Sequence, residues 1–209
     1  MENSKIPRIP LLIFGLGALV CAGSFTLDDA VTRWMGAHQS PGLHHAARFF
    51  TRWGDFPPIV AALLILFGVA WLRRKPVCIR ILILMLGSAV TAGLAANILR
   101  FLTGRARPSA RVAPGWYWMR AHGKWIAGSH QYSSFPSAHT AVAIACVAPL
   151  WICLSGWKRV LIAGPATVIA LCIAGSRIAL DAHHLSDVLV SVWIGALLSA
   201  LICTRFSSK

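Results

Sequence analysis

Three short segments of the chain carry side chains that together can transfer a phosphoryl group: residues 100–108, 136–139 and 176–187. The first contains two arginines seven positions apart, Arg100 and Arg107, and the third contains Arg177. The planar guanidinium fork of arginine binds phosphate oxygens through paired hydrogen bonds. Since the chain has 20 Lys and Arg but only 6 Asp and Glu, we expect these arginines to hold an anion.

The second segment predicts a helix start. Ser137 and Ala138 follow Pro136, so their backbone N–H groups are expected in a first helical turn, where such groups favour an anion. His139 comes next, and its imidazole can protonate an oxygen that leaves phosphorus.

The third segment contains the candidate nucleophile. His183 and Asp187 are four residues apart, so at a helix start they share one face. A carboxylate that bonds one ring nitrogen fixes the tautomer and leaves the other nitrogen nucleophilic or basic. These residue types predict attack on phosphorus, with the developing negative charge stabilised by the arginines.

Each of these features alone also has a purely structural interpretation. Arg100 can be an arginine at a helix end that extends to the membrane interface, and Pro136 with Ser137 can mark only a helix N-terminus. His183 and Asp187 can be a structural pair, and the arginines can bind lipid headgroups. Their occurrence together, in three neighbouring segments, favours a functional site.

The three segments resemble the type 2 phosphatidic acid phosphatase (PAP2) superfamily, whose pattern is Lys-x6-Arg-Pro, then Pro-Ser-Gly-His, then Ser-Arg-x5-His-x3-Asp. The resemblance covers residues 100–187. It implies that His183 is the nucleophile and forms a phosphohistidine, that Asp187 orients it, and that His139 is the acid. It also implies a set of residues that hold the phosphoryl oxygens: Arg100, Arg107, Ser137, Ala138 and Arg177.

Two positions depart from this pattern. Arg100 stands where lysine is usual, which keeps the charge but changes its shape, and Ala138 stands where glycine is usual, which narrows the space beside a phosphate. Neither change removes a reacting group, so we expect activity. The family needs no metal or cofactor, and no carboxylate-rich Mg²⁺ site is evident in the sequence. His184 is expected beside the site or at the membrane interface.

The elements that must position these residues are predicted to be membrane helices. The chain is 57% hydrophobic and 12% charged, whereas soluble domains have about 25% charged residues. Six windows are apolar enough to cross a bilayer, the second of them short: 9–27, 58–72, 77–99, 138–157, 160–178 and 185–204. We therefore predict an all-α, six-span membrane domain over residues 1–209, with residues 28–56 in the membrane interface.

The formal net charge of +14 is consistent with this layout. Six spans put both termini on the side of the basic turns at 73–75 and 158–159, and the positive-inside rule places that side in the cytoplasm. The three motif segments then lie at the outer, periplasmic face of a bacterial inner membrane. Basic turns and phosphate-binding arginines explain the excess charge, so no nucleic acid partner is predicted.

The predicted function is hydrolysis of a lipid phosphomonoester or pyrophosphate, with membrane lipids as partners. Undecaprenyl pyrophosphate is the leading substrate, and the alternatives are the 1-phosphate of lipid A, phosphatidylglycerol phosphate and phosphatidic acid. The aromatic and basic loop 109–134 suits a polyanionic headgroup and interfacial anchoring equally. A different class of function is a non-enzymatic lipid-phosphate binder or transporter, although few polar residues beyond Asn97 lie within the spans. A haloperoxidase-like vanadate enzyme conflicts with six spans.

Overall fold

The computed structural model describes residues 8–207 of the 209-residue chain. Its α-helices, given by residue range, are these: α1 (Arg8–Ser24), α2 (Asp28–Ala37), α3 (Pro41–Trp53), α4 (Phe56–Leu72), α5 (Pro76–Thr103), α6 (Ala138–Cys153), α7 (Gly156–Lys158), α8 (Gly164–Ala179) and α9 (Leu185–Ser207). Short turns are η1 (Phe25–Leu27), η2 (His130–Tyr132) and the π-helical η3 (Arg159–Ala163), and a hairpin joins β1 (Arg120–Ala121) to β2 (Lys124–Trp125). The predicted all-α class is confirmed.

Each of the six predicted windows is mostly helical, but the helices differ in length. Three helices are long and apolar enough to cross a membrane by themselves: Pro76–Thr103, Gly156–Ala179 and Leu185–Phe206. A fourth candidate is the bent pair of α3 and α4, and α6 is shorter. The chain is therefore a helical protein with three to four candidate spans among its described residues, and the count of six stays a prediction.

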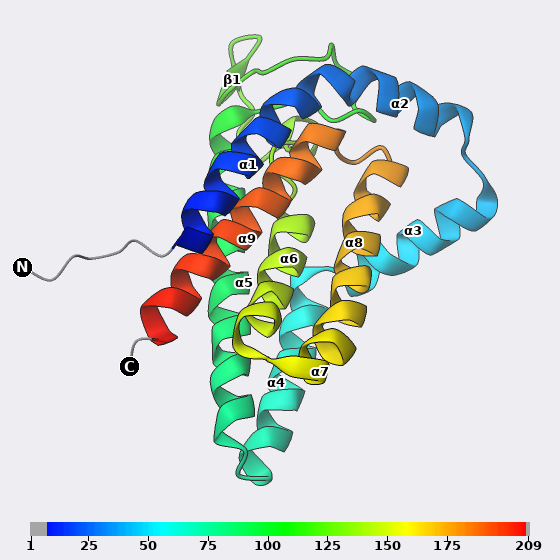
Figure 1. The fold of residues 1–209 in the computed structure, drawn as a ribbon. Coiled ribbons are helices and arrows are strands. Elements are labelled where there is room, and N and C mark those ends of the chain that lie inside the picture. The colour runs from blue at the N-terminus through cyan, green and yellow to red at the C-terminus, as the bar shows by residue number, and fades with distance from the viewer. Residues whose placement is uncertain (1–7, 208–209) are drawn as a thin grey trace, which may run out of the picture.

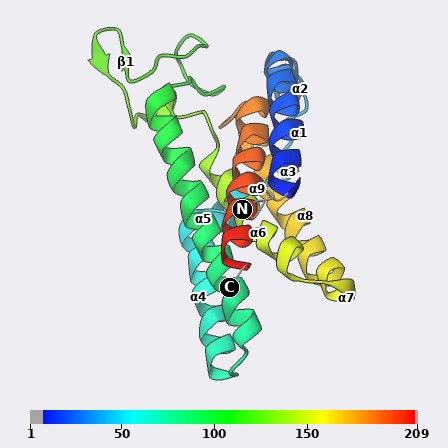
Figure 2. The same ribbon diagram turned by 60° about the vertical axis from the view of Figure 1, so that its left-hand side comes forward.

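Helices α5, α6 and α9 form the centre of the bundle, with α1 against α9 and α8 against α6 (Figures 1 and 2). Small side chains make this centre compact. Ala92 and Ala96 of α5 are fully buried against Ala141 and Ala145 of α6. A Cβ at Gly195 of α9 would come within 2.7 Å of the Ala141 carbonyl oxygen. Small residues let membrane helices approach closely, while large apolar side chains such as Leu64 and Ile65 stay exposed on the outside.

The predicted interfacial segment 28–56 forms two helices, α2 and α3, and reaches the start of α4. Ser40 caps α3 by accepting a hydrogen bond from the backbone N–H of Leu43, and Asp55 caps α4 through the N–H of Phe56. The axes of α3 and α4 meet at 56°. We call this bend the α3–α4 elbow. In Figure 1 it places α3 beside α8, while α4 runs back along α5.

Gly104 ends α5 and begins the loop that leads to the hairpin. Its φ of +56° is left-handed, and a Cβ there would lie 1.9 Å from the carbonyl oxygen of Trp118, so only glycine fits. Backbone hydrogen bonds then join this loop to the other motif segments. Ser134 N–H donates to the Arg105 carbonyl at 3.1 Å, and Ser109 N–H donates to the Asp181 carbonyl at 3.0 Å. The three segments consequently meet at the loop-covered end of the bundle, opposite the α4–α5 turn (Figure 1).

Candidate active site

Four helix ends carry most of the residues singled out in the sequence. Arg100 lies in the last turns of α5 and Arg177 in the last turns of α8, while His139 and Asp187 lie in the first turns of α6 and α9. His183 lies in the connection between α8 and α9. The fold thus gathers at one end the residues that the sequence separates by more than 80 positions.

The His183 ring is held by the loop before α6. The ring is 1% exposed, and its Nδ1 lies 2.5 Å from the Ser134 carbonyl oxygen. Because a carbonyl oxygen only accepts, Nδ1 must carry the proton and Nε2 must carry the lone pair. Nε2 is buried and has no hydrogen-bond partner. The imidazole is therefore fixed in the tautomer that a nucleophile at phosphorus requires.

Burial also determines the charge of this imidazole. It lowers the pKa of His183 to about 4, although the nearby Asp187 carboxylate opposes the shift. The ring is consequently neutral and nucleophilic at physiological pH.

Asp187 is linked to His183 mainly through Ser134. Its Oδ2 is 3.8 Å from His183 Nδ1, beyond hydrogen-bond range. The same oxygen accepts hydrogen bonds from the Ser134 hydroxyl and from the His184 backbone N–H, the latter at 2.8 Å. Ser134 therefore binds the imidazole with its carbonyl and the carboxylate with its hydroxyl. The predicted role of Asp187 in orienting His183 stays a prediction, and this geometry gives it a route.

A buried ion network lies behind Asp187. Arg105 donates to Asp187 Oδ1 at 2.5 Å and to Asp28 Oδ2 at 2.6 Å. Ser186 completes the network, because its N–H and hydroxyl donate to Asp28 at 2.8 and 2.6 Å and its hydroxyl accepts from Arg105. We call these four residues the Arg105 network. The Arg105 guanidinium also lies 4.8 Å from the ring centre of Trp116, within cation–π range.

Arg100, Arg107 and Arg177, which we call the arginine cradle, are much less well partnered. Arg177 donates to the Thr51 hydroxyl at 3.0 Å, and Arg100 makes only a 3.5 Å contact with the Pro136 carbonyl. The Nε atom of each of the three arginines is buried without a partner. Buried polar atoms are normally satisfied, so the three unpartnered Nε atoms together with the unpartnered His183 Nε2 indicate a site for an anion.

Ser137 and Ala138 lie at the start of α6, the helix start that the sequence predicted. Ser137 is fully buried, its N–H donates to the Asp187 carbonyl at 3.4 Å, and its hydroxyl accepts from Thr140 at 3.1 Å. Both groups already have partners within the protein. Ala138 begins α6 and lines the pocket described next. Phosphate contacts from Ser137 and Ala138 remain predictions.

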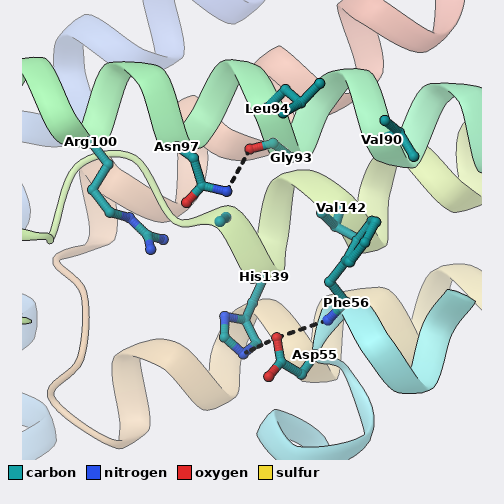
Figure 3. A pocket seen from close by; sticks show the side chains of 10 residues that line it. Asp55, Phe56, Val90, Gly93, Leu94, Asn97, Arg100, His139 and Val142 are labelled. Carbon is teal, nitrogen blue, oxygen red and sulfur yellow. Dashed lines mark hydrogen bonds and ion pairs between the residues drawn. The ribbon is translucent and has the colours of Figure 1, made fainter. Parts of the chain in front are cut away.

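A pocket of about 400 Å³ opens between α4, α5 and α6 beside His139. Arg100, His139 and Asp55 form its polar end, and apolar residues including Val90 and Leu94 form its wall (Figure 3). Asp55 Oδ1 lies 3.4 Å from His139 Nε2. We call this cavity the lateral pocket, since its walls are membrane-helix faces. This contact holds the imidazole at the polar end of the pocket.

His184, the neighbour of His183 in the chain, contacts the loop after α5. Its Nε2 lies 3.2 Å from the Ala106 carbonyl, so it ties the α8–α9 connection to the loop after α5. Within residues 8–207, no three His, Cys, Asp or Glu side chains are arranged to hold a metal ion.

The chain has only six acids, so an Asp beside an apolar segment is a strong candidate for a buried ion pair. This signal applies to Asp28 and Asp55, and none in the sequence marks Arg105 or Ser134. The partners of Arg105 are 77 and 82 positions away, and no local spacing identifies such pairs.

Comparisons with known proteins agree with this architecture. The family model for the PAP2 superfamily matches residues 80–209. The fold is similar to that of a transmembrane PAP2-type phosphatidylglycerolphosphate phosphatase from Bacillus subtilis, with a TM-score of 0.71, 20% identity and 96% of each chain covered. It is also similar to LpxE of Aquifex aeolicus, with a TM-score of 0.61, 19% identity, and 85% of this chain and 95% of that chain covered. No curated protein gives a significant sequence match.

Proposed function

The chain belongs to the PAP2 superfamily, and from this premise we propose that it is a membrane phosphatase that hydrolyses a lipid phosphate through a phosphohistidine. The observation that carries the proposal is the buried, unpartnered His183 Nε2 beside the three unpartnered Nε atoms of the arginine cradle. A tetrahedral phosphate supplies the acceptors that the guanidinium groups lack and the electrophile that the imidazole lacks.

The covalent step follows from these positions. The Nε2 lone pair of His183 attacks phosphorus, and the bond to the leaving oxygen breaks. The proton stays on Nδ1, and this N–H donates a hydrogen bond to the Ser134 carbonyl. The Asp187 carboxylate offsets the positive charge of the phosphorylated imidazole. The arginine cradle stabilises the equatorial oxygens, whose charge increases in the transition state. His139 protonates the leaving oxygen and then removes a proton from the water that hydrolyses the phosphohistidine.

The lateral pocket supports a lipid leaving group. His139, Arg100 and Asp55 lie at its polar end, and apart from Asn97 the rest of its wall is apolar. A leaving group protonated by His139 therefore extends between membrane helices, which favours a lipid tail over a soluble alcohol.

We further propose undecaprenyl pyrophosphate as the first substrate candidate. Three cradle arginines suit a substrate with several phosphate charges. Phosphatidylglycerol phosphate is the second candidate, supported by the name of the Bacillus subtilis neighbour. The 1-phosphate of lipid A and phosphatidic acid follow. The proposal also includes the predicted topology, which has six spans, cytoplasmic termini and a periplasmic site. It further includes a reaction that needs no metal.

Phosphate release from these four lipids by the purified protein in detergent tests the proposal. We expect turnover of at least one lipid in excess EDTA, inhibition by vanadate, whose trigonal-bipyramidal form imitates the transition state, and loss of at least about 10⁴-fold in His183→Gln. His45→Gln, on an exposed part of α3, is the matched control and should keep its activity. Full activity of His183→Gln would exclude the mechanism, and loss in EDTA that Mg²⁺ restores would exclude metal independence.

The alternative function is a binder or transporter that keeps the arginine cradle as an anion site. Turnover separates the two, since a binder protects or moves the lipid phosphate whereas an enzyme releases inorganic phosphate. Few polar residues lie in the interiors of the described helices, and one of them, Asn97, bonds its own helix through the Gly93 carbonyl. This arrangement favours the enzyme.

A further inference from the structure

A second polar pocket, of about 310 Å³, lies on the loop side of the arginine cradle. Two loops form it: residues 107–111, which follow α5, and residues 130–131, which begin η2. The two loops are tied together by a hydrogen bond from Arg107 N–H to the Gln131 carbonyl at 2.9 Å. We call this cavity the outer pocket. It contains no residue of the lateral pocket.

The side chains of the outer pocket are suited to an anion. Arg107, Arg111 and His130 supply cationic or hydrogen-bonding nitrogens, and Ser109 and Gln131 supply a hydroxyl and an amide. No acidic residue lines the pocket. Asp181 contacts Ser109 through its backbone carbonyl, which accepts from the Ser109 N–H. Two arginines without a carboxylate partner match the paired hydrogen-bond geometry of a phosphate.

The outer pocket shares one residue, Arg107, with the arginine cradle. The Nε atom of Arg107 is buried and unpartnered. The electrostatic effect of the cradle also reaches His130: Arg107 is the largest cause that lowers the pKa of this histidine, and Arg177 and Arg100 act in the same direction. An anion in the outer pocket would therefore be attracted by the whole cradle.

We propose that the outer pocket is a second phosphate-binding site, in which Arg111 and His130 hold a phosphate dianion next to the reacting one. This inference rests on the proposed phosphatase function, because it assigns the second site to the same reaction. The dianion has two possible sources with the same chemistry. One is the inorganic phosphate that leaves after hydrolysis, and the other is a second phosphate group of the lipid substrate.

The experiment compares the wild type with the double variant Arg111→Ser/His130→Asn. Arg120→Ser is the control, since Arg120 is exposed in β1 of the same loop region and does not line the pocket. The probe is inorganic phosphate. Its binding is measured by titration calorimetry on the purified protein, which requires no turnover, and its inhibition constant is measured in the phosphate-release assay.

We expect one of two results for the double variant. In the first, it binds inorganic phosphate about 10-fold more weakly. In the second, its affinity for inorganic phosphate is unchanged and its KM rises about 10-fold for a lipid diphosphate only. The first result identifies the released phosphate as the occupant, and the second identifies the lipid's own phosphate. Unchanged phosphate affinity, inhibition constant and KM would overturn the proposal. If no lipid is turned over but the variant still loses phosphate binding, the outer pocket stands and the proposed function fails.

Discussion

Arg105 and Arg107 are two residues apart on one loop, yet their environments are opposite. Arg105 lies between Asp28 and Asp187, with distances of 2.6 and 2.5 Å, and an aromatic ring covers its face. Arg107 belongs to a cradle in which three Nε atoms have no partner. The charge of Arg105 is balanced by two carboxylates, and we call the Arg105 network the closed region. The cradle has unpartnered Nε atoms, and we call it, with His183, the open region.

The difference suggests how the proposed phosphate site is kept in place. Three cations at close range repel one another and resist burial. The Arg105 network fixes the start of α9 and the loop after α5 through contacts that do not involve the cradle arginines. The positions of these arginines therefore do not depend on contacts among themselves. Preorganised donors of this kind stabilise charge that develops in a transition state. The comparison predicts that Arg105 governs stability and that the cradle governs rate.

Removing Arg105 should have the largest effect on stability. Arg105→Ala leaves Asp28 and Asp187 buried without their cation, and breaking a buried pair in this way costs about 3–5 kcal/mol. We expect a large fall in the thermal midpoint of unfolding, measured by scanning fluorimetry in detergent, and a loss of activity. Arg120→Ala, at an exposed position, should leave the midpoint unchanged. A stable, active Arg105→Ala protein would remove the distinction between the two regions.

Removing a cradle arginine should lower the rate without lowering the stability. Arg177→Ala should lower kcat/KM for the lipid substrate by about 10²–10³-fold, the usual effect of losing one donor to transition-state charge. Its thermal midpoint should stay the same or rise, because repulsion with Arg100 and Arg107 is relieved. A midpoint that falls as far as that of Arg105→Ala would show that the cradle is structural.

The open region should also make stability depend on pH. The pKa of His183 is about 4 in the folded protein, against an ordinary value of 6.5. Between these values the unfolded chain binds a proton that the folded protein does not, so stability falls as the pH decreases through this window. We expect a loss of about 2 kcal/mol between pH 7 and pH 5, from 1.36 kcal/mol per pKa unit.

Chemical denaturation at the two pH values measures this loss, and His183→Gln should show a smaller one. An equal pH dependence in the variant would assign the effect to other groups.

The smallest expected effect concerns the support of the cradle by α3. Thr51→Val removes the hydroxyl that accepts from Arg177 at 3.0 Å, and a hydrogen bond of this kind contributes about 1 kcal/mol. We expect kcat/KM to fall about fivefold with little change in stability. Thr91→Val is the matched control, because the Thr91 hydroxyl only donates to the Gly87 carbonyl of its own helix. Equal effects of the two variants would argue against positioning by Thr51.

The open region could be predicted from the sequence, whereas only Asp187 of the closed one could. Arg100, Arg107, Arg177 and His183 form short local patterns, and the fold places them at one end of the bundle. The sequence predicts only an interfacial segment around Asp28, and Arg105 is one of the unspecified positions between Arg100 and Arg107. Their contact joins positions that are 77 residues apart, and such pairing depends on how α1, α2 and α9 pack.

The helices followed from hydrophobic windows for a similar reason, since each window is a local property of the chain. Their ends depended on details outside the windows. Gly104 ends α5 through a left-handed conformation and a close approach to Trp118. The interfacial segment divides at Ser40 and Asp55, where side chains cap the next helix.

The α3–α4 elbow links two parts of the site that no motif connects. Thr51, on one side of the bend, contacts Arg177, and Asp55, on the other side, contacts His139. The arginine that we propose to hold phosphate and the histidine that we propose as the acid therefore have their supports on either side of one bend. A change in the angle of 56° would move both supports together and alter how the two side chains are aligned.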